Sequence, residues 1–407
     1  MGARSPFRRE ASGGSPGGTY DVVILRRNDF TVDGRVERQA ESLGAAGFRV
    51  LVLALGGGRL PRRERREGYD LRRVAVDVVP DLGLRGLGDR IGRRARALGA
   101  TGTYYGLAAG TIAAVQPRFV HCHDLDTLVP GIAGARWVGA KVIYDSAELW
   151  TERNHGLVGW RAAVDGIKTR GLERALIGQP DAVITVSDGI ADELATRYGV
   201  PRPVVLRNVP RRPTLGDSPL REAVGARGPI LLHLGVVDIH RGLENVVRAL
   251  PRFPEATLAL LGPARPYALD PLMALARRLG VEDRVVHLPP VAREAIISWA
   301  SGADLGICLF EPVCQSHVMA LPNKIFEYAF ANLPILASDL PDMAALVRRE
   351  RLGVVCDPES PSSVELGIHR LLGSQPARRT EAEAERFRER FCWEREQDKL
   401  LELYGRA

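Results

Sequence analysis

The sequence predicts an α/β protein built from two tandem, doubly wound domains that face a central cleft. Three observations support this fold class. Apolar runs of strand length alternate with helical patterns along almost the whole chain, its 407 residues exceed what one ordinary core holds, and a proline-rich break falls near the middle. The apolar runs are continuous rather than alternating, so the strands should be covered on both faces, as in parallel sheets. Such sheets bind ligands at the carboxyl ends of their strands, which predicts a ligand cleft between the domains.

The first domain is expected to span residues 19–208. Short runs of Val, Ile and Leu predict its strands, and an amphipathic pattern predicts a helix over 36–46. The predicted strands are 21–25, 49–55, 119–121, 141–144 and 182–186. Residues 1–18 are rich in Gly, Ser, Pro and Arg and lack the apolar stretch of a signal peptide, so a disordered tail is expected there.

Pro210, Pro213 and Pro219 interrupt the pattern and place a domain boundary near residue 209. The alternation then restarts and predicts a second domain over 209–380. Its predicted strands are 230–234, 256–261, 285–288, 305–309, 334–336 and 354–355. A charged helical pattern follows, with an apolar face, and residues 381–407 are expected to form a C-terminal helix. Two placements stay open, because this helix could cap the second domain or cross back to the first.

Composition excludes several classes of protein. No run of about 18 apolar residues occurs, so no membrane-spanning segment is expected. The five cysteines form no CxxC pair and are odd in number, which argues against a disulfide framework or a zinc ribbon and fits a reducing cytoplasm. The net charge of +7 favours phosphate or anionic lipid as a ligand. Nucleic acid is not expected, because no basic stripe is interleaved with aromatic residues.

The segment Ala320-Leu-Pro-Asn-Lys-Ile-Phe-Glu-Tyr328 is the strongest candidate for a binding site. Pro322 suits the first turn of a helix, whose N-terminus attracts a phosphate. Lys324 then lies near the phosphate as a cation. Glu327, one turn further on, offers a carboxylate that can accept both hydroxyls of a ribose. The alternative is a surface ion pair between Lys324 and Glu327.

Residues 320–338 resemble the donor motif of the family 4 retaining glycosyltransferases, which have the GT-B fold. Asn332 stands where that family usually has glycine, a position that tolerates a left-handed turn. Further segments match in the same order, namely Asp33-Gly-Arg-Val36, His121-Cys-His-Asp124, Tyr144-Asp-Ser-Ala-Glu148 and Arg241-Gly-Leu-Glu244. The resemblance implies a metal-independent glycosyltransferase (EC 2.4). Such an enzyme moves a sugar from a nucleotide-sugar donor to a hydroxyl of a polysaccharide, glycolipid or secondary metabolite.

The resemblance also implies roles for individual residues. Arg241 would be a second partner of the diphosphate, and because the preceding loop carries no arginine, the cationic clamp would rest on Arg241 and Lys324. The implied donor-binding residues are Gly235, Arg241, Gly242, Pro322, Asn323, Lys324, Ile325 and Glu327. The candidates on the acceptor side are Asp33, Gly34, Asp124 and Glu148, with Asp126 nearby, and the carboxylates among them could equally be helix caps or turn residues.

No catalytic base is assigned, because retention in this family is thought to use the leaving phosphate itself to deprotonate the acceptor. No cofactor is implied, since the nucleotide-sugar is a substrate. His121, His123 and Asp124 could suggest a metal site. That interpretation is disfavoured, because no matching His/Cys cluster appears elsewhere in the sequence.

Two departures from the family pattern concern the transferred sugar. Ala147 stands where relatives have a histidine facing the sugar, and Met319 stands where they have a glutamate holding its hydroxyls. Glu311 is nearby, but its spacing is wrong. Three interpretations of Ala147 stay open. The donor could lack a hydroxyl, as a 6-deoxy sugar does, or His121, His123 or His155 could replace the missing histidine, or the chain could be an inactive relative.

Other functions fit the sequence less well. A dehydrogenase is rejected because no G-x-G-x-x-G follows the first strand. A sugar-nucleotide epimerase on the same fold and a non-catalytic partner of another transferase remain alternatives. The expected partners are a nucleotide-sugar donor and a small-molecule, lipid-linked or glycan acceptor, in the cytoplasm. The basic stretch 85–98 could rest on the inner membrane face, although its glycines favour an ordinary solvated surface.

Overall fold

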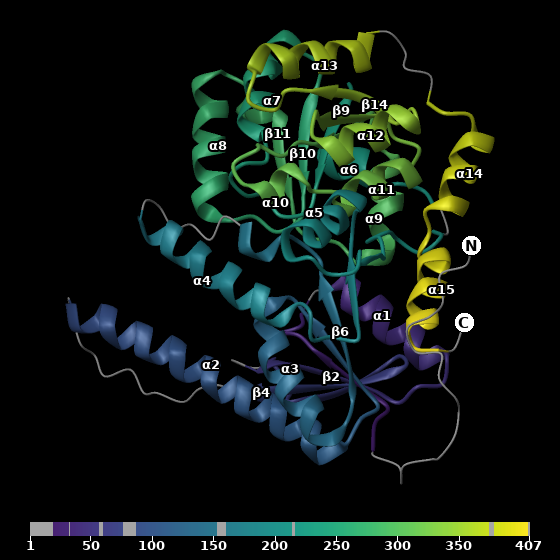
Figure 1. The fold of residues 1–407 in the computed structure, drawn as a ribbon. Helices are drawn as coiled ribbons and strands as arrows, with labels where there is room; N and C mark the ends of the chain where they lie inside the picture. Colours follow the sequence, from purple (N-terminus) through teal and green to yellow (C-terminus); the bar gives the residue numbers. More distant parts are fainter. Residues whose placement is uncertain are drawn as a thin grey trace.

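The computed structural model describes residues 19–31, 33–56, 60–75, 87–152, 160–213, 216–373 and 378–405, with the backbone alone for 87–98 and 160–163. Two largely parallel sheets, each covered by helices on both faces, are stacked along the long axis of the molecule (Figure 1). The predicted fold class is confirmed. The disordered tail expected over residues 1–18 lies outside the described residues.

The first sheet has eight strands in the order β3-β4-β2-β1-β5-β6-β7-β8. All neighbours pair in parallel except β3, which is antiparallel to β4. Its strands are β1 (Val22–Leu25), β2 (Val50–Gly56), β3 (Arg63–Arg66), β4 (Tyr69–Ala75), β5 (Phe119–His123), β6 (Lys141–Ser146), β7 (Ala182–Thr185) and β8 (Val204–Val205). The five predicted strands are present. Strands β3 and β4 were not predicted, because their many charged residues conceal an edge hairpin.

Helices alternate with the strands of the first sheet. Those described are α1 (Gly34–Ala45), α2 (Leu87–Val115), α3 (Leu125–Val138), η1 (Trp150–Glu152), α4 (Trp160–Leu176) and α5 (Asp188–Tyr198). The backbone of α2 is helical through most of the basic stretch 85–98 despite its glycines. Residues 85–86 and the side chains of 87–98 lie outside the described residues, and with them the expected membrane contact. In the described part of the chain, no helix combines the length and apolar character needed to cross a bilayer.

The second sheet is parallel throughout and has six strands in the order β11-β10-β9-β12-β13-β14. The strands are β9 (Ile230–Leu234), β10 (Thr257–Leu261), β11 (Val285–Leu288), β12 (Leu305–Cys308), β13 (Ile335–Ser338) and β14 (Gly353–Cys356). The helical elements are α6 (Leu220–Val224), α7 (Leu243–Ala249), η2 (Leu250–Arg252), α8 (Pro266–Arg278), η3 (Glu282–Arg284), η4 (Arg293–Ala295), α9 (Ile296–Ser301), α10 (Gln315–Val318), α11 (Asn323–Phe330), α12 (Pro341–Arg349) and α13 (Pro361–Gly373).

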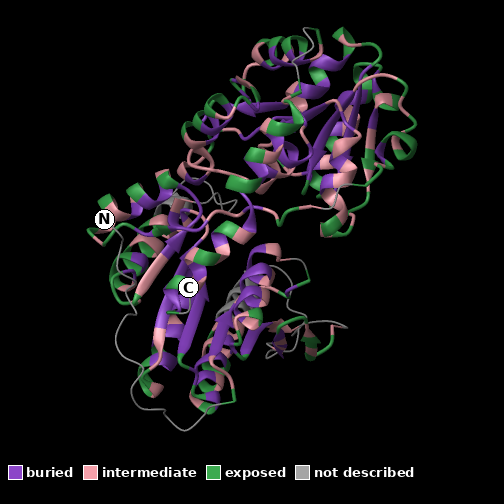
Figure 2. Ribbon diagram, turned by 90° about the vertical axis from the view of Figure 1, so that its right-hand side faces the viewer, coloured by how far each residue is buried: buried purple, intermediate pink, exposed green. Residues whose placement is uncertain are grey.

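Each sheet reverses its strand order beside its first strand. In the first sheet β1 lies between β2 and β5, and in the second β9 lies between β10 and β12. Loops that leave such a switch point diverge and leave a crevice at the carboxyl ends of the strands. The central strands are buried, while the edge strand β3 and the outer faces of the helices are exposed (Figure 2). Ligand contacts are therefore expected from the loops after β1 and β9.

The C-terminal segment forms two helices, α14 (Glu381–Arg390) and α15 (Trp393–Leu403), rather than one continuous helix. Phe387 and Phe391 pack into the core of the second domain. In contrast, Trp393 belongs to a core cluster of the first domain and donates from Nε1 to Ser42 Oγ at 2.8 Å. The chain thus returns to the first domain, and α15 packs against α1 (Figure 1).

Candidate active site

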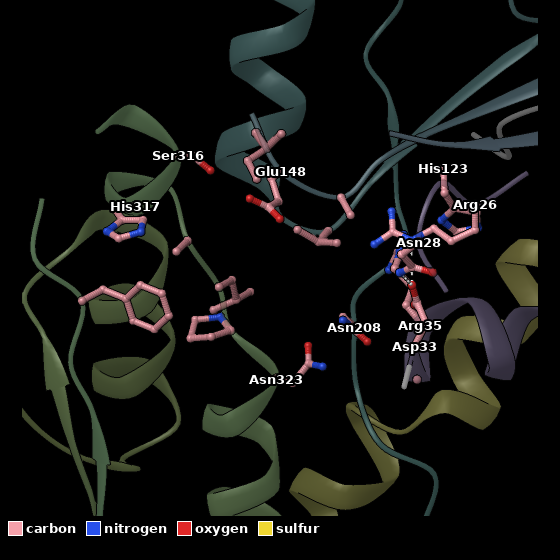
Figure 3. Close-up of a pocket in the computed structure, with 18 of the residues that line it drawn as sticks. Arg26, Asn28, Asp33, Arg35, His123, Glu148, Asn208, Ser316, His317 and Asn323 are labelled. Carbon is pink, nitrogen blue, oxygen red and sulfur yellow. Dashed lines mark hydrogen bonds and ion pairs between the residues drawn. The ribbon is translucent and has the colours of Figure 1, made fainter. Parts of the chain in front are cut away.

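A cavity of about 500 Å³ lies between the two domains, where the switch points of the sheets face each other. We call it the cleft cavity. Figure 3 shows its two walls, with His317, Ser316 and Asn323 from the second domain opposite Arg26, Asn28 and Asp33 from the first. Of the predicted site residues, Asp33, Gly34, Glu148, Arg241, Pro322 and Asn323 line this cavity.

Helix α11 presents its N-terminus to the cleft cavity. Pro322 has extended backbone angles and precedes the first helical residue, Asn323. No side chain caps this end, and its free N–H groups suit an anion. Tyr328 fixes the helix to β9, because its hydroxyl donates to Leu232 O at 2.8 Å and accepts from Leu234 N at 2.9 Å. Ile325 is fully buried in the core of the second domain, so its side chain anchors the helix there.

Two cations stand over one aromatic ring beside this helix end. The Arg241 guanidinium carbon lies 4.1 Å from the centroid of the Phe310 ring, and Lys324 Nζ lies 5.6 Å from it. Within the described residues neither cation forms an ion pair, and Arg241 Nη1 is buried without a hydrogen-bond partner. Burial, together with the nearby Arg241 charge, lowers the pKa of Lys324 to about 8. Both cations are therefore desolvated and have no paired carboxylate in the described structure, as expected of a site for a diphosphate.

Two glycines shape the loop that delivers Arg241. Gly235, just after β9, has φ 92°, and Gly242, which precedes helix α7, has φ 61°. A Cβ on Gly242 would lie 2.9 Å from Leu309 Cβ, so a side chain there would be strained and would also clash. Glycine at 242 is therefore needed to place Arg241 over Phe310.

Glu327 does not line the cleft cavity. It lies in a second cavity of about 840 Å³, which we call the linker-side cavity, together with Arg38, Arg211 and Arg293. Burial raises the pKa of Glu327, while Arg38 and Lys324 act in the opposite direction. No ion pair joins Lys324 to Glu327 in the described structure, so the simple surface pair that the sequence allowed is absent. The first turn of α11 thus separates two cavities, with Asn323 in one and Glu327 in the other.

The aspartates predicted on the acceptor side are held by arginines. Asp33 caps α1 by accepting from Val36 N, and it accepts from Arg26 Nε at 2.7 Å. Arg26 also pairs with Asp124, which has a left-handed φ of 66°. Asp126 pairs with Arg27 at 3.4 Å. Arg26 was not predicted, although its place directly after β1 could have indicated it.

Glu148 and Gly34 contribute differently to the first-domain wall. Glu148 projects into the cleft cavity towards Ser316 and His317 of the other domain (Figure 3). Gly34 lines the same cavity at the start of α1. Asn28, Asn208 and Phe310 also line it and were not predicted. The carboxyl-end rule could have indicated Asn28 and Phe310, since each closely follows a strand, whereas nothing in the sequence singles out Asn208.

The buried histidines of β5 form a cluster with Asp145 rather than with Asp124. The rings of His121 and His123 stack with their centroids 4.6 Å apart. Ligand atoms of these three residues lie within 4.8 Å of one another, as in a metal site. However, the Arg35 guanidinium donates to both Asp145 oxygens, at 2.8 and 2.9 Å. A metal ion there would meet this fixed positive charge, so the cluster fits an ion-paired core and not a metal centre.

Ala147 and Met319, the two residues that depart from the family pattern, lie in different surroundings. Ala147 lines the cleft cavity, whereas Met319 packs against the apolar core of the first domain. Glu311, the nearby carboxylate, accepts from His240 Nδ1 at 2.8 Å if that nitrogen carries the proton, and it does not line the cavity. His123 lines the cleft cavity, His121 is bound to the Tyr404 hydroxyl, and His155 lies outside the described residues.

Two Rossmann-like domains that face a cleft, with Arg241 and Lys324 beside the helix end that opens onto it, have the arrangement of the GT-B architecture. Residues 32–209 match the family described as "Glycosyl transferase 4-like domain", and residues 228–374 match "Glycosyl transferases group 1". The chain belongs to the group 1, or family 4, glycosyltransferases.

Relatives of known sequence agree with this membership. The chain is 28% identical over 252 residues to a D-inositol 3-phosphate glycosyltransferase of Xylanimonas cellulosilytica, a match that covers 58% of this chain and 59% of the relative. It is 25% identical to the glycogen synthase of Mycobacterium tuberculosis over 70% of this chain and 68% of that enzyme.

Two solved structures show the same fold. Sucrose-phosphate synthase from Thermosynechococcus elongatus superposes with a TM-score of 0.76 at 17% identity, covering 94% of this chain and 98% of the other. Anabaena Alr3699/HepE in complex with UDP and glucose superposes with a TM-score of 0.70 at 15% identity, covering 95% and 100%.

Proposed function

We propose that this protein is a retaining glycosyltransferase that moves a sugar from a nucleotide-sugar to a hydroxyl of a small-molecule, lipid-linked or glycan acceptor. The observation that carries the proposal is the pair Arg241 and Lys324 on the Phe310 ring beside the N-terminus of α11. Negative charge accumulates on the departing diphosphate as the glycosidic bond breaks. Preformed, partly desolvated cations and free N–H groups stabilise that charge without reorganisation.

The relatives support this assignment at the level of reaction class. One matched relative is named a D-inositol 3-phosphate glycosyltransferase and another a glycogen synthase, and a structural neighbour binds UDP and glucose. We place the diphosphate at Arg241 and Lys324 and the ribose at Glu327. Glu148 and Gly34, on the opposite wall, are then candidates for contacts with the acceptor.

We further infer that the transferred sugar lacks its outer hydroxyl, as a 6-deoxyhexose does. Ala147 offers only a methyl group to the cleft cavity, and Met319 turns into the core of the first domain. Neither position supplies the hydrogen bond that a hydroxyl would need when it leaves water. The Ala147→His variant tests this inference in a donor panel of hexoses and their 6-deoxy counterparts. An unchanged donor preference would contradict it.

Thermal-shift measurements with UDP, GDP, ADP and dTDP test the donor site. At least one nucleotide should stabilise the wild type, and the shift should shrink in Lys324→Ala and Glu327→Ala. Arg136→Ala is a suitable control, because Arg136 is a surface residue that pairs with Gln179. A shift that stays the same in all three variants would overturn the placement of the site.

Release of nucleotide from the matching nucleotide-sugar separates the rival functions. A transferase releases nucleotide in an acceptor-dependent manner. An epimerase converts the sugar with no acceptor-dependent release, and a non-catalytic partner gives no turnover in either assay.

A further inference from the structure

Arg38 is a buried cation without a carboxylate partner among the described residues. It lies on α1 of the first domain and is 6% exposed. One of its terminal nitrogens donates to Asn208 Oδ1, and its guanidinium lies over the Trp393 ring at 5.6 Å. Its Nε is buried and has no hydrogen-bond partner, and within the described part of the chain no ion pair includes Arg38. Glu327, across the linker-side cavity, offsets only part of this charge, and a buried charge that is partly compensated favours the binding of a further anion.

The surroundings of Arg38 add positive charge. A Cβ placed on Gly34 would lie 3.3 Å from Arg38 Nη1 and 3.2 Å from Arg293 Nη1, so both guanidinium groups lie beside Gly34. Arg293 comes from the second domain and is balanced by Glu37 at 3.0 Å. Arg38 forms no ion pair in the described structure. Burial together with the charge of Arg293 lowers its pKa to about 10, while Glu327 acts in the opposite direction.

Arg38 lies on the wall of the linker-side cavity, close to a residue that lines the cleft cavity. Arg38 lines the linker-side cavity together with Glu327, while its neighbour Gly34 lines the cleft cavity. Lys324 and Glu327 are three residues apart on α11, which is about 5 Å along a helix. Arg38 and Glu327 line the same cavity, and each charge acts on the pKa of the other, so a ligand that reaches from Lys324 to Glu327 comes within the field of the Arg38 guanidinium. A nucleoside diphosphate has this form, with phosphates at one end and ribose at the other.

We propose that Arg38 is a donor-binding residue supplied by the first domain, whose guanidinium contacts the diphosphate of the nucleotide between Lys324 and Glu327. This inference rests on the proposed function. It adds a third cation to the Arg241 and Lys324 pair and places it on the opposite domain. The nucleotide would then bridge the two domains directly, before any acceptor is bound.

The test compares nucleotide binding by the full-length wild type and Arg38→Met. Methionine keeps a long apolar stem over Trp393 but removes the charge. Binding is measured by calorimetry with the nucleoside diphosphate, among UDP, GDP, ADP and dTDP, that stabilises the wild type. Arg38→Met should bind this diphosphate about 10- to 100-fold more weakly than the wild type does. The affinity for the corresponding nucleoside should change less than about twofold. A purely structural role for Arg38 would weaken both ligands alike.

Arg212→Met serves as the matched control. Arg212 lines the same linker-side cavity but is exposed and pairs with Glu385, so its loss should leave diphosphate affinity within about twofold. If Arg38→Met fails to fold, Arg38→Gln takes its place, because its amide can still donate to Asn208, and the same loss is expected.

The outcomes are distinguishable. Equal diphosphate affinity in the wild type and the Arg38 variant would overturn this inference and leave the proposed function intact. If the wild type binds none of the four nucleotides, the proposed function and this inference both fail.

Discussion

Lys324 is a lysine whose pKa is brought towards neutral pH by burial and by a neighbouring arginine. Its pKa of about 8 lies below the usual value for lysine, because the charged form loses hydration beside Phe310 and Arg241. Only the protonated form attracts a diphosphate. Nucleotide binding should therefore be strongest below pH 8 and weaken as the lysine loses its proton.

We predict that the dissociation constant of the wild type for a nucleoside diphosphate rises roughly tenfold between about pH 7 and pH 9. The Lys324→Arg variant should show a flatter profile, because arginine keeps its charge over this range. Calorimetry across this pH range measures the effect. The same slope in both proteins would mean that another group is responsible.

At the scale of an element, the loop from β9 to α7 depends on glycine. Gly242 combines a left-handed φ of 61° with a close approach to Leu309. Gly139, at the end of α3, has a similar φ of 70°, but a Cβ added there would meet no atom within 4 Å. A substitution at Gly139 therefore tests backbone strain alone, whereas a substitution at Gly242 adds a steric clash.

We predict that Gly139→Ala lowers the free energy of unfolding by about 1 kcal/mol through backbone strain alone. Gly242→Ala should lower it further and should also weaken nucleotide binding, because the displaced loop moves Arg241. Urea unfolding and nucleotide titration of both variants measure this. Equal losses of stability with unchanged nucleotide affinity would contradict the role given to this loop.

Elements with a strong local signal were predictable from the sequence. The apolar runs predicted most strands of both sheets, and the segment after Pro322 predicted α11. Contacts between segments that are distant in the sequence were not predictable, because no local pattern encodes them. The contacts of Arg26 with Asp33 and Asp124 depend on how the loops after β1 and β5 meet within the first domain. The separation of Glu327 from the cleft cavity depends on where α11 lies between the two cavities. The β3-β4 hairpin was missed because its exposed arginines hide the alternation of an edge strand.

At the scale of the whole molecule, α15 ties the end of the chain to the first domain. Trp393, the first residue of α15, is fully buried, and its indole donates to Ser42 on α1. Tyr404 adds a hydrogen bond to His121 at 2.8 Å. The core of the first domain is thus completed by side chains that follow the second domain in sequence.

We predict that Trp393→Ala destabilises the protein by about 3–5 kcal/mol, because the loss of a large buried side chain leaves a cavity. Trp137→Ala is the control, since Trp137 is 71% exposed and should change stability by less than about 0.5 kcal/mol. Urea unfolding followed by fluorescence and circular dichroism measures both. Similar losses in the two variants would show that α15 contributes little to the first domain.

The route of α15 also bears on how this protein is made. A ribosome releases the segments of the first domain long before it synthesises Trp393, Leu400 and Tyr404, which fill that domain's core. Domains generally fold as units during synthesis, the N-terminal one first. Here the apolar core of the first domain stays partly exposed until α15 has been synthesised. A nascent chain stalled before residue 393 should therefore bind chaperones more strongly than the finished protein does.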